Sequence, residues 1–312
     1  MRVLVLGAGG TGGYFGGRLA QSGADITFLV RPARAEQLHA HGLSLRSPLG
    51  DADIAVAHVT ADALPTLARE RPFDLVLLSC KAYDLDSAMA SAAPAVAANT
   101  AVLPILNGLA HYPLLDARFG AERVLGGLCF ISAMKGPNGE VLHLGRPASI
   151  TFGEREGNPD SERTTAFAAL CAHAGIDHVR SPRIASEQWA KYTFLSTLAA
   201  ATCLMRASVG GIVAGEGGDA FMRALYRECL AVAEVEGEPI AEAAQQSALT
   251  TLTQSGSPLK ASMLRDLEAG QAVEAMQIVG DMLHRAQAAD QSAPLLAAAW
   301  CHLQAYELAR AN

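Results

Sequence analysis

The stretch MRVLVLGAGGTGGYFGG at residues 1–17 decides the fold of this chain. An apolar run at residues 3–6 leads directly into three glycines with the spacing GxGxxG and then into a helical pattern. In such a turn the first glycine lets the chain turn sharply, the second lets the backbone approach a pyrophosphate, and the third packs the helix on the strand. The free N–H groups and the positive dipole end of the helix attract the charge of the phosphate. This order predicts a dinucleotide-binding fold, and the residues expected to line the cofactor are Gly7, Gly9, Gly10 and Gly12.

The residue that closes the second apolar run, at residues 26–30, distinguishes between the dinucleotides. An acidic side chain there would accept the ribose 2′-hydroxyl, whereas an arginine favours a 2′-phosphate. Arg31 stands at this position, and no carboxylate follows until Glu36. NADP(H) is therefore the predicted cofactor, with Arg31 as one of its contacts. The alternative is that Arg31 is only a solvated loop arginine.

Composition narrows the class of protein. A chain of 312 residues with 50% hydrophobic content is long enough for two domains, each with its own core. The net charge of −7, without any block of basic residues, argues against a nucleic-acid partner. No apolar run reaches the roughly 18 residues that a membrane span needs, and the chain enters a strand without a charged leader. We therefore expect a cytoplasmic protein with no membrane partner.

Cysteine, histidine and lysine usage bears on the chemistry. The six cysteines form no CxxC pair, and the one histidine pair with ligand spacing, His39 and His41, flanks a helix end where solvated side chains are expected, so we expect neither disulfides nor a metal. An ammonium can release a proton near neutral pH when its surroundings shift it, whereas a guanidinium cannot. Each retained lysine is thus a candidate acid, although any one of them could be an ordinary surface residue. Among the 24 lysine and arginine residues, the lysines are Lys81, Lys135, Lys191 and Lys260.

The first part of the chain alternates strands and helices, which predicts an α/β Rossmann-type doubly wound sheet. A hairpin with a turn at residues 48–51 interrupts this alternation, and a further strand pair is expected at residues 140–144 and 148–152. The strands expected in the parallel sheet lie at residues 2–6, 26–30, 74–78, 101–106 and 123–133.

After Ser181-Pro182 the pattern is helical only, which predicts an all-α C-terminal domain. We expect an NADP-binding domain at residues 1–181 and a helical substrate domain at residues 182–312, with ligands in a shared cleft. The alanine-rich helices could pack within one chain or support a homodimer. The helices are expected at residues 184–206, 218–236, 240–253, 259–268, 273–289 and 294–309.

Polar side chains follow two of the predicted parallel strands. Lys81 comes after the strand that begins at Leu75, and Asn107 comes after the strand that begins at Val102. Ligands of doubly wound sheets bind at the carboxyl ends of the strands, so both residues are candidates for cofactor and substrate contacts. Gly108 would give Asn107 room to present its amide. The alternative is that Asn107-Gly108 is only a turn.

These segments together resemble the ketopantoate reductase (2-dehydropantoate 2-reductase) family, over nearly the whole chain. The resemblance rests on GAGGTGG, Lys81, LNG at residues 106–108, WAKY at residues 189–192 and SMLRDLEAGQAVE at residues 262–274. It implies a Rossmann domain followed by a helical domain, NADPH as the hydride donor, and 2-dehydropantoate as the substrate.

The resemblance also implies roles for single residues. It makes Lys191 the general acid that hydrogen-bonds the keto oxygen of the substrate. Hydride arriving at a carbonyl carbon leaves an alkoxide, which a positioned ammonium both stabilises and protonates. Glu274 would hold the substrate hydroxyl and help to orient the lysine, and Ser262 would contact the substrate. Asn107 and Lys81 would line the cofactor and the substrate. Without the resemblance, Glu274 could equally be a solvated helix residue.

The sequence departs from the family next to the expected acid. Better-known members carry asparagines at the fourth and eighth positions after the lysine, which share its helix face, and here these positions are Leu195 and Ala199. Met276 stands where many members have an aspartate. We therefore expect hydrogen bonds to the substrate from other side chains, with these candidates: Ser196, Thr197 and Thr202.

The resulting hypothesis is an enzyme of pantothenate biosynthesis. It would reduce 2-dehydropantoate to pantoate by hydride transfer from NADPH to C2, with Lys191 as the proton donor. Leu195 and Ala199 leave a second hypothesis open, an NADPH-dependent reductase of another small 2-oxo acid. A non-catalytic NADPH-binding protein is the third.

Overall fold

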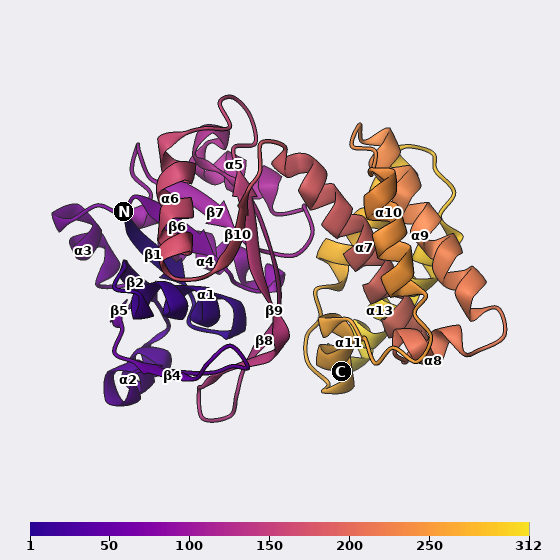
Figure 1. The fold of residues 1–312 in the computed structure, drawn as a ribbon, viewed down its shortest axis with the longest axis horizontal. Helices are drawn as coiled ribbons and strands as arrows, with labels where there is room; N and C mark the ends of the chain where they lie inside the picture. The colour runs from indigo at the N-terminus through magenta and orange to yellow at the C-terminus, as the bar shows by residue number, and fades with distance from the viewer. Residues whose placement is uncertain (312) are drawn as a thin grey trace. The chain divides into compact units, whose positions relative to one another are not determined.

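The structure, a computed structural model, describes residues 1–311 and divides into two compact units (Figure 1). The first unit comprises residues 1–106 and 111–184, and the second comprises residues 107–110 together with the chain from Ala185 onward. The short segment 107–110 thus follows a strand of the first unit in sequence but clusters with the second unit. Each unit has its own hydrophobic core.

The first unit contains a parallel five-stranded sheet with the order β5-β2-β1-β6-β7. β1 lies inside this sheet, with β2 on one side and β6 on the other, so the order changes direction at β1. The strands are β1(Arg2–Leu6), β2(Asp25–Leu29), β5(Ala57–Val59), β6(Leu75–Leu78) and β7(Ala101–Pro104). The helices of this part of the chain are α1(Gly10–Gln21), α2(Pro32–His41), α3(Leu64–Glu70), α4(Leu85–Ala92) and α5(Tyr112–Phe119), with 3-10 turns η1(Ala82–Asp84), η2(Ala93–Ala95) and η3(Ala121–Arg123).

A second sheet completes the first unit. Its strands follow the order β10-β9-β3-β4, and β8 also pairs with β9. The antiparallel pairing of β3 with β4 confirms the predicted hairpin around residues 48–51. The bounds are β3(Leu43–Arg46), β4(Ala52–Ile54), β8(Gly126–Lys135), β9(Val141–Gly153) and β10(Asp177–Arg180), and α6(Glu162–His173) precedes β10.

Helix α1 packs against both sheets, and its many glycines explain how it can do so. A Cβ at Gly16 would lie 2.8 Å from the ring of Phe28 in the parallel sheet. Toward the second sheet, a Cβ at Gly13 would lie 2.6 Å from Val141 of β9, and one at Gly10 would lie 2.5 Å from a carbonyl oxygen of β8. Side chains at these positions would push the sheets apart. The repeat GTGGYFGG therefore fixes the spacing between the two layers as well as the turn before α1.

The predicted fold class is confirmed, but one strand prediction is only partly correct and another is wrong. The segment expected as a parallel strand at residues 123–133 forms a parallel bridge to Val102 of β7 only at Val124, and from Gly126 it is β8, which pairs antiparallel with β9 in the second sheet. The expected pair at residues 140–144 and 148–152 is one strand, β9. Gly145 has φ +113° and the register against β8 shifts nearby, so the chain bulges there without reversing. β10 was not predicted.

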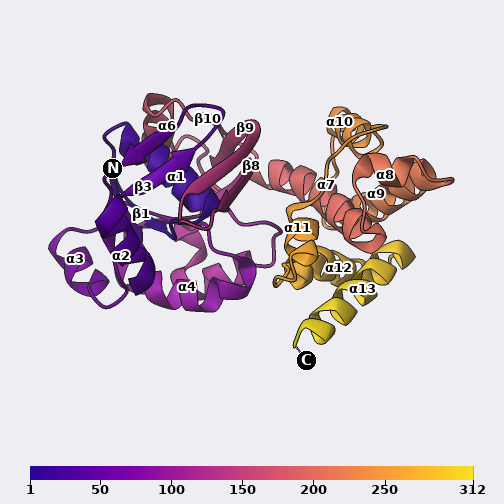
Figure 2. The same cartoon turned by 90° about the horizontal axis from the view of Figure 1, so that it is seen from below.

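The second unit, in its described residues, contains helices and no strand. α7 forms its centre, because its second half is buried on every side among the other helices. Figure 2 shows α12 and α13 beside each other at the end of the chain. The elements are α7(Ile184–Met205), α8(Val209–Val213), α9(Gly218–Val235), α10(Glu242–Leu252), α11(Ser262–Glu268), the π-helix η4(Met276–Gly280), α12(Asp281–Ala288) and α13(Pro294–Ala311).

The helix expected at residues 273–289 is therefore only partly correct, because its first turns are a π-helix that begins at Met276. The short helix α8 was not predicted. Between residues 1 and 311, no helix combines the length and the apolar character that crossing a membrane requires.

Candidate active site

The glycine-rich turn lies at the carboxyl end of β1, where the strand order changes direction. Gly7 has φ +89°, a left-handed conformation that glycine adopts without steric cost. Its N–H donates to the carbonyl oxygen of Leu29 at the end of β2, 2.9 Å away. The turn is thereby tied to the neighbouring strand at the switch point of the sheet, which is where doubly wound folds bind their ligands.

Gly9 and Gly12 lack side chains for different reasons. Gly9 is the N-cap residue of α1, and a Cβ at this position would meet no atom within 4 Å. The first turn of α1 carries no acidic residue, so the space beside its N-terminus suits a phosphate. At Gly12 a Cβ would lie 2.1 Å from Oγ of Ser79 and 2.6 Å from the carbonyl oxygen of Gly7. Gly12 is thus needed for packing α1 on the strand ends.

Two arginines follow β2, and the sequence analysis selected only one of them. Arg31 is the N-cap residue of α2, with a side chain 79% exposed and an ion pair to Asp84 at 3.1 Å. An exposed pair of this kind contributes about 0–1 kcal/mol, so a phosphate could replace the carboxylate. Arg34 is half-buried and donates from Nη2 to the carbonyl oxygen of Ala8, in the glycine-rich turn, at 3.0 Å. Its spacing of three residues from Arg31, about one helical turn, was visible in the sequence.

Lys81 lies at the carboxyl end of the parallel sheet, as its place after β6 predicts. It is the half-buried N-cap residue of η1. Two residues earlier, the Ser79 hydroxyl donates to the carbonyl oxygen of Leu6 at 2.9 Å and links the ends of β6 and β1. The glycine-rich turn, Arg31 and Lys81 therefore follow β1, β2 and β6, which are neighbours in the parallel sheet. All three lie at the carboxyl end of that sheet.

Lys191 and Asn107 are brought together in the second unit, although 84 residues separate them in sequence. Lys191 lies in the first half of α7, and its Nζ donates to Oδ1 of Asn107 at 3.1 Å. Both side chains are half-buried. Gly108 has φ +75°, so the chain turns directly after Asn107. The structure thus pairs the predicted acid with a neutral amide acceptor.

Glu274 and Ser262, the other two predicted substrate residues, belong to the second unit as well. Glu274 is only 6% exposed, which excludes the alternative of a solvated helix residue. It stands two residues before the π-helix η4. Ser262 is the first residue of α11 and is exposed.

The hydroxyl groups expected to replace the family's asparagines do not do so. Ser196, Thr197 and Thr202 are fully buried in α7. Thr197 and Thr202 donate to carbonyl oxygens of their own helix at 2.8 and 2.7 Å, and Ser196 donates to Ile278 at 3.3 Å. Their hydroxyls serve the core of the second unit, so this expectation is wrong. Leu195 is half-buried and packs on the same core.

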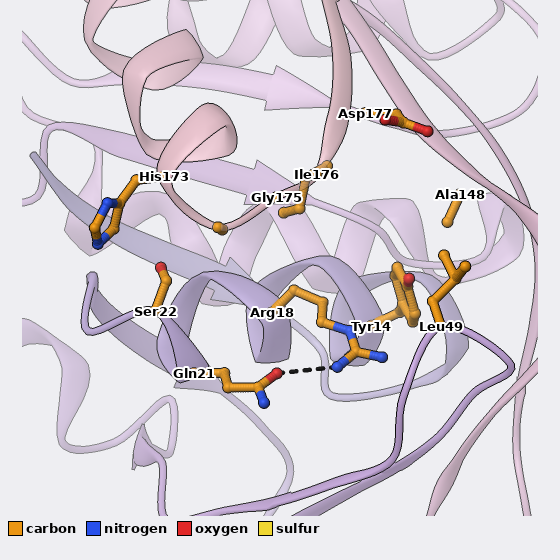
Figure 3. A pocket seen from close by; sticks show the side chains of 11 residues that line it. Tyr14, Arg18, Gln21, Ser22, Leu49, Ala148, His173, Gly175, Ile176 and Asp177 are labelled. Carbon is orange, nitrogen blue, oxygen red and sulfur yellow. Dashed lines mark hydrogen bonds between the residues drawn. The ribbon is translucent and has the colours of Figure 1, made fainter.

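A pocket on the surface of the first unit does not coincide with these residues (Figure 3). It lies at the far end of α1 from Gly9, between Arg18 and the turn from α6 to β10. Arg18 is already engaged there, because Nη1 donates to Oε1 of Gln21 at 3.0 Å and a second nitrogen donates to the carbonyl oxygen of Gly50. This pocket is lined by none of the site residues that the sequence analysis selected.

Four of the cysteines are core residues of the two units. Burial raises the pKa of the Cys171, Cys203 and Cys229 thiols to about 12, so they remain protonated at neutral pH. Among residues 1–311, no group of three or more histidine, cysteine, aspartate or glutamate side chains could hold a metal ion.

Comparison with known proteins identifies the class. The sequence matches the family description "Ketopantoate reductase PanE/ApbA" over residues 3–157 and "Ketopantoate reductase PanE/ApbA C terminal" over residues 183–307. These two segments are the ones that carry the parallel sheet and the helical unit. The chain belongs to the ketopantoate reductase family, and it is an NAD(P)-dependent oxidoreductase that acts on a CH–OH/ketone pair.

Individual relatives differ in how far their own function is known. An uncharacterized oxidoreductase of Bacillus subtilis, YkpB, is 36% identical over 307 residues, which cover 98% of this chain and 99% of the relative. A 2-dehydropantoate 2-reductase of Mesorhizobium japonicum is 28% identical, with 95% and 94% covered. The crystal structure of 2-dehydropantoate 2-reductase from Methylococcus capsulatus, 28% identical, matches with a TM-score of 0.89 and covers 100% of this chain and 98% of that chain.

Proposed function

We propose that this oxidoreductase uses NADPH to reduce 2-dehydropantoate to pantoate, a step of pantothenate biosynthesis. Relatives at 28% identity carry the name of this reaction. The observation that carries the proposal is the hydrogen bond of 3.1 Å between Lys191 and Asn107. It gives the ammonium group of Lys191 a hydrogen-bond partner outside its own helix, on the loop that follows β7.

Lys191 is the proposed proton donor. NADPH would supply the hydride, and the oxygen of the substrate then becomes an alkoxide that needs a nearby positive charge. An ammonium has three N–H donors. The bond to Asn107 orients one of them and leaves the group able to donate to a keto oxygen as well. Proton transfer from Lys191 to that oxygen completes the alcohol, with C2 carrying the new C–H bond.

The first unit, which comprises residues 1–106 and 111–184, is the proposed NADP-binding domain that the sequence analysis expected at residues 1–181. Gly7, Gly9, Gly10 and Gly12 would bring the backbone and the N-terminus of α1 to the pyrophosphate. Arg31 would contact the 2′-phosphate. Its exposure and its weak pairing with Asp84 support this role, because little is lost when a phosphate takes the place of the carboxylate.

The second unit, which comprises residues 107–110 and the chain from Ala185 onward, is the proposed substrate domain that the sequence analysis expected at residues 182–312. Glu274 would accept a hydrogen bond from the substrate hydroxyl, and its burial supports the role because a hydrogen bond to a carboxylate is stronger away from water. Ser262 would contact the substrate from the start of α11. Lys81 and Asn107 would contact both ligands.

A second candidate is the reduction of another small 2-oxo acid. One observation favours it: the α7 face beside Lys191 carries Leu195, and the nearby hydroxyls of Ser196 and Thr197 are buried in the core. A face with so few polar groups would suit an acid without the terminal hydroxyl of 2-dehydropantoate.

The test is to follow the absorbance of reduced nicotinamide with 2-dehydropantoate and a panel of 2-oxo acids. We expect Lys191→Ala to lower kcat by about 100- to 10,000-fold, the usual contribution of a general acid. Lys135→Ala, which changes an exposed lysine of β8, is the matched control and should leave kcat unchanged.

The outcomes separate the three hypotheses. Turnover of 2-dehydropantoate at the rate of the Lys191→Ala variant would reject that substrate. A higher kcat/KM for an acid without the terminal hydroxyl would favour the second candidate. NADPH binding measured by calorimetry, without hydride transfer to any acid of the panel, would leave only the non-catalytic protein.

A further inference from the structure

The π-helix η4 begins two residues after Glu274, and its hydrogen bonds point to a role in the site. π-helices are rare and occur frequently at functional sites. The carbonyl oxygen of Ile278 within η4 lies 3.1 Å from the hydroxyl of Tyr192 and 3.3 Å from that of Ser196. Both hydroxyls come from α7, the helix that carries Lys191. The wide turn is thus held by side chains that follow the proposed acid.

Of the two hydroxyls, that of Tyr192 lies closer to the carbonyl oxygen of Ile278. The side chain of Tyr192 is 2% exposed, and the single proton of its hydroxyl is shared between Oδ2 of Asp281 at 2.8 Å and the carbonyl oxygen of Ile278 at 3.1 Å. Asp281 also accepts from Nε of Arg285 at 2.9 Å, and Arg285 pairs with Glu236 at 3.0 Å. Burial and the carboxylate of Asp281 raise the pKa of the Tyr192 hydroxyl well above its usual value, so it remains a donor. A charged network therefore fixes the hydroxyl of the residue that follows Lys191 in α7.

The loop that carries Asn107 contacts η4 at Gln277, close to the ring of Tyr192. A Cβ at Gly108 would lie 2.3 Å from the carbonyl oxygen of Gln277 and 3.7 Å from the ring of Tyr192. Any other residue at Gly108 would push the loop away from the π-helix. The chain neighbours of the three proposed site residues thus meet at one junction: Gly108 beside Asn107, Tyr192 beside Lys191, and η4 beside Glu274.

Helix α13 holds the segment that leads to Glu274 from the other end. The carboxylate of Glu307 accepts from the N–H of Val273 at 2.9 Å. The hydroxyl of Tyr306 donates to the carbonyl oxygen of Gln271 at 2.7 Å. Glu274 therefore sits between a stretch fixed by α13 and a turn fixed by α7.

We propose that Tyr192 is a positioning residue of the reductase: by holding η4, it sets Glu274 and the Asn107–Lys191 pair in the geometry that proton transfer needs. The proposal rests on the roles given above to Lys191 and Glu274. Tyr192 acts through these residues, because its hydroxyl is directed to Asp281 and η4. Misplacing a reacting group by about 1 Å can lower a rate by roughly 100-fold, so a small shift of the junction has a measurable effect.

The test compares Tyr192→Phe with Tyr226→Phe. Tyr226 is equally buried in the second unit, and its hydroxyl makes no hydrogen bond to η4 within the described residues. We expect Tyr192→Phe to lower kcat, expressed per NADPH-binding site, by about 10-fold or more. The KM for NADPH should stay unchanged. Backbone amides of residues 275–281 should exchange with solvent faster. Tyr226→Phe should change neither quantity.

Several results would overturn the proposal. An unchanged kcat in a folded Tyr192→Phe variant would do so, whether or not the amides exchange faster. Equal losses of kcat in the two tyrosine variants would show a general effect of the core. If Tyr192→Phe does not fold, Ser196→Ala removes the other donor to Ile278, and a kcat equal to wild type would reject the role of η4. Absence of turnover by the unmodified protein with every 2-oxo acid would instead reject the proposed function.

Discussion

The glycines of the first turn show how one residue type serves two purposes within six positions. At Gly9 the missing side chain leaves space, and at Gly12 it permits contact with Ser79 and with the carbonyl oxygen of Gly7. The spacing GxGxxG alone does not separate the two effects. Substitution by alanine separates them, because only one of the two positions has room for a methyl group.

We expect Gly9→Ala to leave stability within about 0.5 kcal/mol of wild type, because φ is −88° and no atom lies within 4 Å of the new methyl group. NADPH affinity should fall about 10-fold or more, since the methyl group would stand where the pyrophosphate approaches. Gly12→Ala should destabilise the protein by about 1–3 kcal/mol through overpacking. Thermal unfolding and NADPH fluorescence titration measure both effects. An unchanged midpoint for Gly12→Ala would contradict the packing argument.

The place of a site residue could be predicted from the sequence where that residue comes shortly after a strand. Gly7 directly follows β1, and Lys81 and Asn107 come three residues after the last residues of β6 and β7. In a parallel sheet, the positions that follow the strands lie at the same end of the sheet, the carboxyl end. Arg34 and Tyr192 were missed because their importance comes from contacts with Ala8 and Asp281, which are distant in sequence or in another helix. The hydrophobic periodicity of the sequence carries no information about contacts of that kind.

At the scale of elements, hydrophobic periodicity located most helices and strands but not their pairing. The sequence predicts two strands at residues 140–144 and 148–152, with Gly145 and Pro147 in the turn between them. In the structure, β9 continues through these residues with a bulge. The partner decides this outcome, because β8 is long enough to pair on both sides of the bulge. Similarly, a pattern with a period of 3.6 residues cannot distinguish η4 from the α-helix that follows it.

The connection between β9 and α6 gives a prediction about pH. Glu154, directly after β9, has a side chain 8% exposed and accepts two hydrogen bonds from Arg163 of α6, at 2.7 and 2.5 Å. Burial alone would raise the pKa of this carboxyl, but the hydrogen bonds from Arg163 and Ser161 lower it overall. The pair therefore stabilises the fold above the unfolded-state pKa of about 4.3, and this contribution is lost as the pH falls through the lower, folded pKa.

We expect Glu154→Gln to lower the free energy of unfolding by about 1.5–3 kcal/mol at neutral pH, the usual value of a hydrogen bond to a charged group. The difference from wild type should shrink as the pH falls below about 4, where the wild-type carboxyl also becomes protonated. Urea unfolding at a series of pH values measures this. Glu156→Gln, at an exposed neighbour, is the control. A difference that stays constant with pH would show that the charge of Glu154 is not involved.

At the scale of the whole molecule, the two units divide the proposed chemistry. The candidate phosphate-binding residues from Gly7 to Arg31 belong to the first unit, whereas Asn107, Lys191, Glu274 and Ser262 belong to the second. The segment 107–110 is notable because the chain leaves the sheet after β7 and contributes Asn107 to the helical unit. A homodimer stays a prediction, which sedimentation can test.

This division predicts how cofactors change the unfolding of the chain. A ligand that binds only the folded state adds about 2.7 kcal/mol of stability at 100 times its Kd. We expect NADPH to raise the unfolding temperature more than NADH at equal concentration, because only NADPH offers a 2′-phosphate to Arg31. If the units unfold in separate steps, the step of the first unit should move. Arg31→Ala should reduce the NADPH effect to that of NADH, whereas Lys191→Ala should keep the difference. Equal shifts with NADPH and NADH in the unmodified protein would reject the preference for NADP(H), whatever the activity of the enzyme.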